Sequence, residues 1–192
     1  MPDTVSYAVR RSALEQERVW SVGAGGFSWS APDKAGHFDF NEIATIRLRW
    51  TGSRFDHARY ACDVIRFNGW TETVVSTHYD GPARFSDRAA SYRSFIDALV
   101  RRTAEANPAC RFLAGSSVAG YALNLVAAAA GLLLLVVVLL AIGLPITLLI
   151  AVKLALLAFL VPLALRWLKQ NRPRSFLPHA IPADVLPALG NP

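Results

Sequence analysis

The chain divides into a front part, in which apolar and polar residues alternate, and a back part that is almost entirely apolar. Between Val118 and Leu165 the only ionisable side chain is that of Lys153. One helix over this length would extend roughly 70 Å, more than twice the hydrocarbon thickness of a bilayer at about 30 Å. One straight transmembrane helix is therefore excluded, and the pattern predicts two apolar arms.

The break between the two arms falls at Gly143 and Pro145, in the sequence "AIGLPI". Glycine ends helices and proline begins them, so this pair favours a tight turn. We predict a transmembrane helical hairpin over 118–167, with arms at 118–142 and 145–167. Each arm is long enough to span. A re-entrant hairpin that does not reach the far side of the membrane is the alternative.

The front part shows the two-residue period of β-strands. Strand patterns run through "TVSYAVRR", "RVWSVGAGGFSWSA", "HFDFNEIATIRLRW", "ARYACDVIRF" and "WTETVVSTHY". The glycines of "VGAGG" predict a hairpin turn, because they lack the spacing and the following helix of a phosphate-binding loop. Asn68–Gly69 is a second hairpin signal. We expect the third pattern to form one long strand.

A change of period then predicts one amphipathic helix. Its apolar stripe has i, i+3, i+4, i+7 spacing and consists of Tyr92, Phe95, Ile96, Leu99 and Thr103. Ser86 or Asp87 is placed to cap the start of the helix, and Asn107–Pro108 ends it.

Together these patterns predict an α+β fold for residues 1–117: a bent antiparallel β-sheet closed by a C-terminal amphipathic helix. The strand "FDFNEIATIRLRW", the hairpin after it and the helix "YRSFIDALVRRTAE" resemble the pleckstrin-homology-like (PH-like) domains of small bacterial membrane proteins. The resemblance covers about residues 5–106. It implies binding or scaffolding beside a membrane. An α+β domain of another topology is the alternative.

Charge is distributed as unevenly as hydrophobicity. Residues 1–117 carry 15 of the 20 basic and 13 of the 14 acidic side chains. Basic residues predicted to lie at the membrane surface follow the second arm: Arg166, Lys169, Arg172 and Arg174. With an uncharged turn, the positive-inside rule places both termini in the cytoplasm. We therefore expect a multi-pass protein of the bacterial inner (cytoplasmic) membrane, with the lipid bilayer and not nucleic acid as the partner of its basic residues.

Lys153 is the one charged residue inside the apolar arms. Lysine at mid-helix costs about 2.5–3.5 kcal/mol on insertion scales, which the apolar residues of the second arm offset. Its ammonium group can extend toward the far headgroups. Alternatively, Lys153 faces a bundle interior or a polar path and is an intramembrane functional residue.

Arginine is the dominant base of the front part. Five arginines on two neighbouring strands and their loop form a candidate anionic-ligand patch: Arg47, Arg49, Arg54, Arg59 and Arg66. A guanidinium group suits phosphate or carboxylate. The alternative is a solvated sheet face on which nearby acids balance these charges.

The tail, 168–192, is basic at first and then rich in proline and apolar residues. Disordered tails contain few apolar side chains. We predict that this tail docks as a proline-stiffened strip, either on the front domain or on a partner; a disordered tail is the alternative.

No sequence motif indicates catalysis, a cofactor or a metal site, so we do not expect an enzyme. The pattern favours an integral membrane binding or scaffold protein that presents its PH-like domain at the bilayer. The alternative is a subunit of an oligomeric transport or channel assembly. Small residues in the arms, Ala127 and Gly131 among them, favour packing of the arms on each other or self-association, and a protein partner is expected.

Overall fold

The computed structural model describes residues 4–51, 59–82, 84–141, 150–151, 155, 158, 162, 168–169 and 171–188. The chain forms two compact units. The first contains Met1–Gly115 and Arg174–Pro192, and the second contains Ser116–Pro173. The tail from Arg174 onward therefore belongs to the same unit as the front part.

An antiparallel four-stranded sheet begins the first unit, in the order β1-β2-β3-β4. Its strands are β1 (Val5–Val9), β2 (Arg18–Val22), β3 (Phe27–Ala31) and β4 (Lys34–Phe38). The "VGAGG" segment forms the expected hairpin turn, closed by a 3.0 Å hydrogen bond from Gly23 N to Gly26 O. Gly26 has a φ of +145°, and a Cβ there would lie 2.2 Å from the carbonyl oxygen of Phe38. This turn therefore requires glycine.

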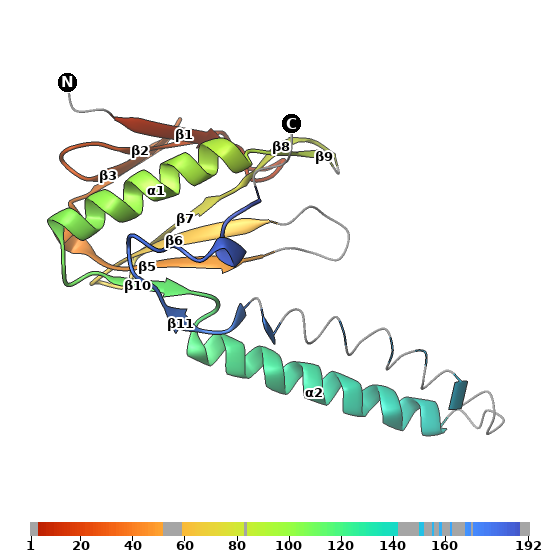
Figure 1. Ribbon diagram of the computed structural model, residues 1–192. Coiled ribbons are helices and arrows are strands. Elements are labelled where there is room, and N and C mark those ends of the chain that lie inside the picture. The colour runs from red at the N-terminus through yellow and green to blue at the C-terminus, as the bar shows by residue number, and fades with distance from the viewer. Residues whose placement is uncertain are drawn as a thin grey trace. The chain divides into compact units, whose positions relative to one another are not determined.

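The second sheet has five strands in the order β11-β10-β5-β6-β7 (Figure 1). These are β5 (Ile43–Trp50), β6 (Tyr60–Arg66), β7 (Thr71–Val75), β10 (Arg111–Ala114) and β11 (Arg174–Ser175). The β6–β7 turn has Gly69 at a φ of +84°, as the Asn-Gly signal predicts. A separate hairpin is formed by β8 (Thr77–Gly81) and β9 (Arg84–Asp87).

One predicted long strand and one further strand pattern are each divided in the structure. The expected strand over 37–50 is interrupted by the 3-10 helix η1 (Phe40–Glu42), and Glu42 Oε2 accepts a 3.1 Å hydrogen bond from Asp39 N. The pattern "WTETVVSTHY" is divided at Ser76, whose buried Oγ accepts a hydrogen bond from Tyr60 N. At η1 the side chain bonds the backbone three residues away and competes with a continuous ladder. Ser76 instead bonds Tyr60 of the neighbouring chain segment through both its backbone and its side chain.

The helix α1 (Ala89–Ala106) closes the core as predicted. Every residue of its predicted apolar stripe is fully buried. The Asp87 carboxylate accepts a hydrogen bond from Ala89 N at 2.9 Å, and the helix ends before Asn107. Asn107 Nδ2 then donates to the carbonyls of Phe40 and Ile43, both at 3.0 Å, which ties the end of α1 to η1 and β5.

The expected α+β class is confirmed, but the sheet arrangement is more complex than a single antiparallel sheet. β10, which the sequence analysis left without a strand, pairs in parallel with β5. The second sheet is therefore mixed, and its edge is built from residues that lie after the helix.

The tail docks on the front domain, which is one of the two docking modes predicted from the sequence. β11 pairs antiparallel with β10, and the ring centroids of Phe176 and Phe112 lie 5.9 Å apart. After the 3-10 helix η2 (Ala183–Val185), Val185 and Leu186 are 0% and 2% exposed within the hydrophobic core.

The second unit contains α2 (Val118–Ala141), which begins where Ser117 Oγ accepts a hydrogen bond from Gly120 N. Among the described residues, its segment Val118–Val138 is the one helix long and apolar enough to cross a membrane. The predicted turn and most of the second arm, 145–167, lie outside the described residues. The predicted two-helix hairpin is therefore seen only as one candidate helix.

Candidate functional site

The strand register places three of the five candidate arginines on one face of the second sheet. Residues on the core side of β5 are Ile46, Leu48 and Trp50. Arg47 and Arg49 alternate with them, and so point to the opposite side. The backbone of Arg59 is paired with Thr51 at 2.6 Å, one step beyond the Trp50–Tyr60 pair. Arg59 therefore shares that opposite side, which we call the arginine face.

Arg49 is held by Asp63 on this face. Its Nε and Nη2 donate to the two carboxylate oxygens at 2.7 and 3.2 Å, and Thr73 Oγ1 donates to Oδ1 at 2.8 Å. The hydrogen bond to Asp63 raises the pKa of Arg49, against the effect of burial. Both oxygens of the acid are thus occupied, although its direct cross-strand partner is Arg47.

Arg47 and Arg59 have no carboxylate among their contacts in the described part of the chain. The Nε of each is buried, and within those same residues it finds no hydrogen-bond partner. Arg59 stacks its guanidinium group over the Phe85 ring at 5.5 Å. Their side chains are partly desolvated, yet no ion pair within the described ranges neutralises their charges.

The parallel strand β10 adds a further arginine that sequence reasoning missed. Arg111 is the register partner of Thr45, which lies on the same face as Arg47. It is exposed. The strand was not predicted because four residues between a helix stop and an apolar segment carry too short a pattern, so no periodic signal pointed to Arg111.

The other two candidates do not join this face in the described structure. Arg66 ends β6 at the opposite end of the sheet, bonded to Glu42 Oε1 at 2.5 Å and stacked over the Phe38 ring at 5.0 Å. Arg54 lies outside the described residues. The predicted patch of five is therefore divided, with Arg47, Arg49 and Arg59 together.

The predicted membrane residues are only partly described. Lys153 and Arg166 lie outside the described residues, so their predicted roles stay predictions. Lys169 and Arg172 are exposed. Arg174 is bonded by both oxygens of Asp184, which closes a short loop of the tail.

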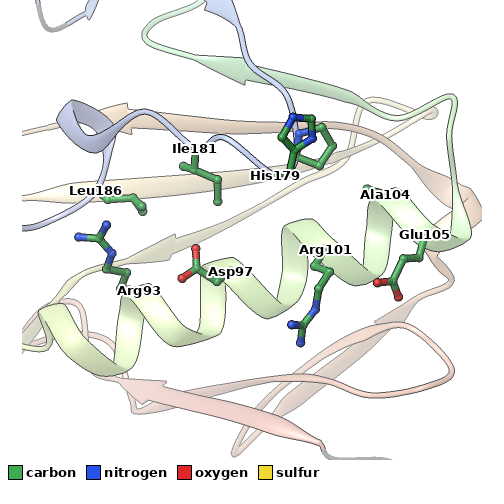
Figure 2. A pocket seen from close by; sticks show the side chains of 9 residues that line it. Arg93, Asp97, Arg101, Ala104, Glu105, His179, Ile181 and Leu186 are labelled. Carbon is green, nitrogen blue, oxygen red and sulfur yellow. The ribbon is translucent and has the colours of Figure 1, made fainter.

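A groove between α1 and the tail is a second feature that the sequence did not indicate. It encloses about 650 Å³ and is lined by charged side chains of α1 and by apolar tail residues. Figure 2 shows Ile181, Leu186 and His179 across the groove from the helix, on which Arg93 and Asp97 project toward the tail. The groove exists only because the tail docks, and its charges are of both signs.

The two cysteines are free and buried. Burial raises the pKa of Cys62, and it raises that of Cys110 to about 11 against a smaller opposing effect of a backbone hydrogen bond. Thiols of this kind are weak nucleophiles at neutral pH. No group of three His, Cys, Asp or Glu side chains in the described ranges is arranged to hold a metal ion.

Comparison of the chain with protein families, with curated proteins and with solved structures found no match. Function must therefore be inferred from the geometry itself.

Proposed function

We propose that this chain is an integral membrane binding or scaffold protein. Two apolar arms form a hairpin in the bacterial inner membrane. The first unit, a PH-like domain completed by the tail, is presented on the cytoplasmic side. The arginine face of that unit is its candidate binding surface.

The observation that carries the proposal is that the chain segments before and after the apolar segment belong to the same unit. The chain leaves the first unit after Gly115 and re-enters it at Arg174, and Ala114 and Arg174 are direct partners in the β10–β11 ladder. If α2 crosses a bilayer, the chain must cross again before Arg174 reaches that position. A single crossing would place the two paired strands on opposite sides of the membrane.

Within the second unit, hydrogen bonds between residues at the two ends of the apolar segment support the same topology. Ser116 N donates to Asn171 O at 3.0 Å, and Ser116 Oγ donates to Asn171 Oδ1 at 3.3 Å. Asn171 is 2% exposed. After α2, residues 142–170 exceed the about 20 residues that one return crossing requires. Their described members at 150–151, 155, 158 and 162 are helical.

The order of elements supports the domain class. Two antiparallel groups of strands, β1–β4 and β5–β7, precede one amphipathic helix that closes the core, which is the arrangement implied by the resemblance to PH-like domains. The positive charge that follows the second arm supports a cytoplasmic location for both termini of the chain.

Cysteine labelling in cells tests this topology. Asp33→Cys and His179→Cys place single reactive thiols on exposed positions of the front part and the tail. Because Cys62 and Cys110 are buried, they should contribute little background. A membrane-impermeant maleimide should label neither variant in intact cells and both after permeabilisation.

Labelling of one variant and not the other in intact cells would show a single crossing and contradict the hairpin. Labelling of both would place the domain outside the cytoplasm. Release of the protein from membranes by alkaline carbonate would remove the integral membrane assignment altogether.

A further inference from the structure

The arginine face carries more positive charge than its ion pairs account for. Side chains of β5, β6, β7 and β10 that share this face include one carboxylate among the described residues, that of Asp63. The same face carries four arginines: Arg47, Arg49, Arg59 and Arg111. Asp63 neutralises Arg49, so three guanidinium charges remain among the side chains that the structure describes on this side of the sheet.

The stems of Arg47 and Arg59 pack against the sheet, whereas Arg111 is exposed. Ala61, directly opposite Arg49 on this face, is only 1% exposed, and the Nε atoms of Arg47 and Arg59 are buried. Such side chains have already lost part of their rotamer freedom and hydration. An anion that binds the terminal nitrogens therefore gains interaction energy at a reduced ordering cost.

The position of this face in the chain indicates which anion it meets. β10 is part of the same sheet, and only Gly115, Ser116 and Ser117 separate it from the apolar helix α2. Three residues span at most about 10 Å. β11 returns to the same edge. The two neighbouring strands at one edge of the sheet, β10 and β11, are thus the ones that lead into and out of the segment that enters the bilayer.

We propose that the arginine face binds the phosphate groups of anionic phospholipids in the leaflet from which the hairpin enters, through Arg47, Arg59 and Arg111. This inference rests on the proposed membrane insertion and adds a ligand to it. A basic side chain near an anionic leaflet strengthens association by about fivefold. Tethering removes the need for high intrinsic affinity.

The test uses the full chain in nanodiscs of phosphatidylcholine with a minor fraction of phosphatidylglycerol. Spin-labelled forms of the two lipids report the relative association of each with the protein. Arg47→Gln/Arg59→Gln should reduce the preference for phosphatidylglycerol between about five- and 25-fold. Arg47→Lys/Arg59→Lys, which keeps both charges, should retain it within about twofold.

The control is Lys34→Gln/Arg101→Gln, which removes the same net charge from exposed positions on β4 and α1. It should leave the preference within about twofold of the wild type, because long-range effects are screened at physiological salt. The unfolding midpoint of each variant shows that the comparison is made between folded proteins.

Equal losses in the control and in the arginine-face variant would show a bulk charge effect and overturn the proposal. A loss in the lysine variant as large as in the glutamine variant would show a packing role, with the same consequence. If inorganic phosphate, at constant ionic strength, abolished the preference, the face would be a site for free phosphate and not for lipid.

The same experiment tests the membrane assignment and the lipid site separately. If the protein does not elute with the nanodiscs, the membrane assignment is wrong. If it elutes with them but the wild type shows no preference for phosphatidylglycerol, the membrane assignment stands and the lipid site is wrong.

Discussion

At the scale of single residues, the two sheets of the first unit are joined by one buried acid. Glu72 on β7 is 3% exposed, and its Oε1 accepts hydrogen bonds from Arg18 Nη1 at 2.5 Å and from Trp20 Nε1 at 2.9 Å. Both donors lie on β2 of the first sheet. A buried charged acceptor with two donors stabilises a specific arrangement, and its loss leaves those donors poorly paired.

We expect Glu72→Gln to reduce the free energy of unfolding by about 2 kcal/mol, since hydrogen bonds to charged groups contribute about 1.5–3 kcal/mol. The matched control is Glu15→Gln, which breaks the surface pair between Arg11 and Glu15. Its cost should stay below about 1 kcal/mol. Urea unfolding in detergent measures both, and equal costs would contradict the linking role of Glu72.

The buried thiol of Cys110 should make stability depend on alkaline pH. Its pKa in the folded protein is about 11, above the about 8.5 of an exposed thiol. Between these values the folded protein holds a proton that the unfolded chain has released, so stability falls as the pH rises. From pH 8 to pH 10 the wild type should lose about 2 kcal/mol more than Cys110→Ala. Parallel pH profiles would contradict this.

At the scale of elements, the tail is part of the core and not an appendage. Leu186 is 2% exposed, whereas Leu177, nine residues earlier in the same tail, is 61% exposed. Their different burial offers a direct test of docking.

Leu186→Ala should lower the free energy of unfolding by about 3 kcal/mol, because it removes buried methyl groups and leaves a cavity. Leu177→Ala should cost less than about 0.5 kcal/mol, as surface substitutions do. Thermal or urea unfolding of the full chain in detergent measures the difference. Equal, small effects would mean that the tail does not pack in solution.

The sequence predicted elements with long, regular patterns and missed short ones. The apolar stripe of α1 and the hairpin glycine Gly69 are where the pattern places them, because local chemistry determines both. β10 and β11 depend on partners far along the chain: Arg111 pairs with Thr45, and Leu113 pairs with Ser175. No local signal encodes such pairing.

The same limit applies to the candidate site. Alternation on β5 was sufficient to place Arg47 and Arg49 on one face. It could not show that Asp63 would bind Arg49 in preference to Arg47, since the choice depends on side-chain reach and on the hydroxyl of Thr73. The membership of Arg111 required the parallel pairing, and the separation of Arg66 required the position of Glu42.

At the scale of the whole molecule, the pairing of β10 with β11 can be tested by a disulfide. Phe176 N donates to Phe112 O at 3.1 Å, so the next pair, Leu113 and Ser175, lies in a non-hydrogen-bonded position with Cα atoms about 4.5 Å apart. Such spacing suits a disulfide.

In reconstituted membranes, Leu113→Cys/Ser175→Cys should form an intramolecular disulfide under mild oxidation. Leu113→Cys/His179→Cys, which moves one thiol along the tail, should not. Non-reducing electrophoresis distinguishes the two. Similar oxidation of both variants would indicate a mobile tail, and oxidation of neither would place the segments apart.

The β10–β11 ladder also determines when the first unit can finish folding during synthesis. β11, Val185 and Leu186 are synthesised after both apolar arms, yet they complete a sheet and a core whose other members precede the arms. The ribosome must therefore release both apolar arms before the first unit can reach its final fold. A transcript truncated within the second arm would produce a first unit with an open sheet edge and an unfilled core. Cellular proteases degrade products of this kind.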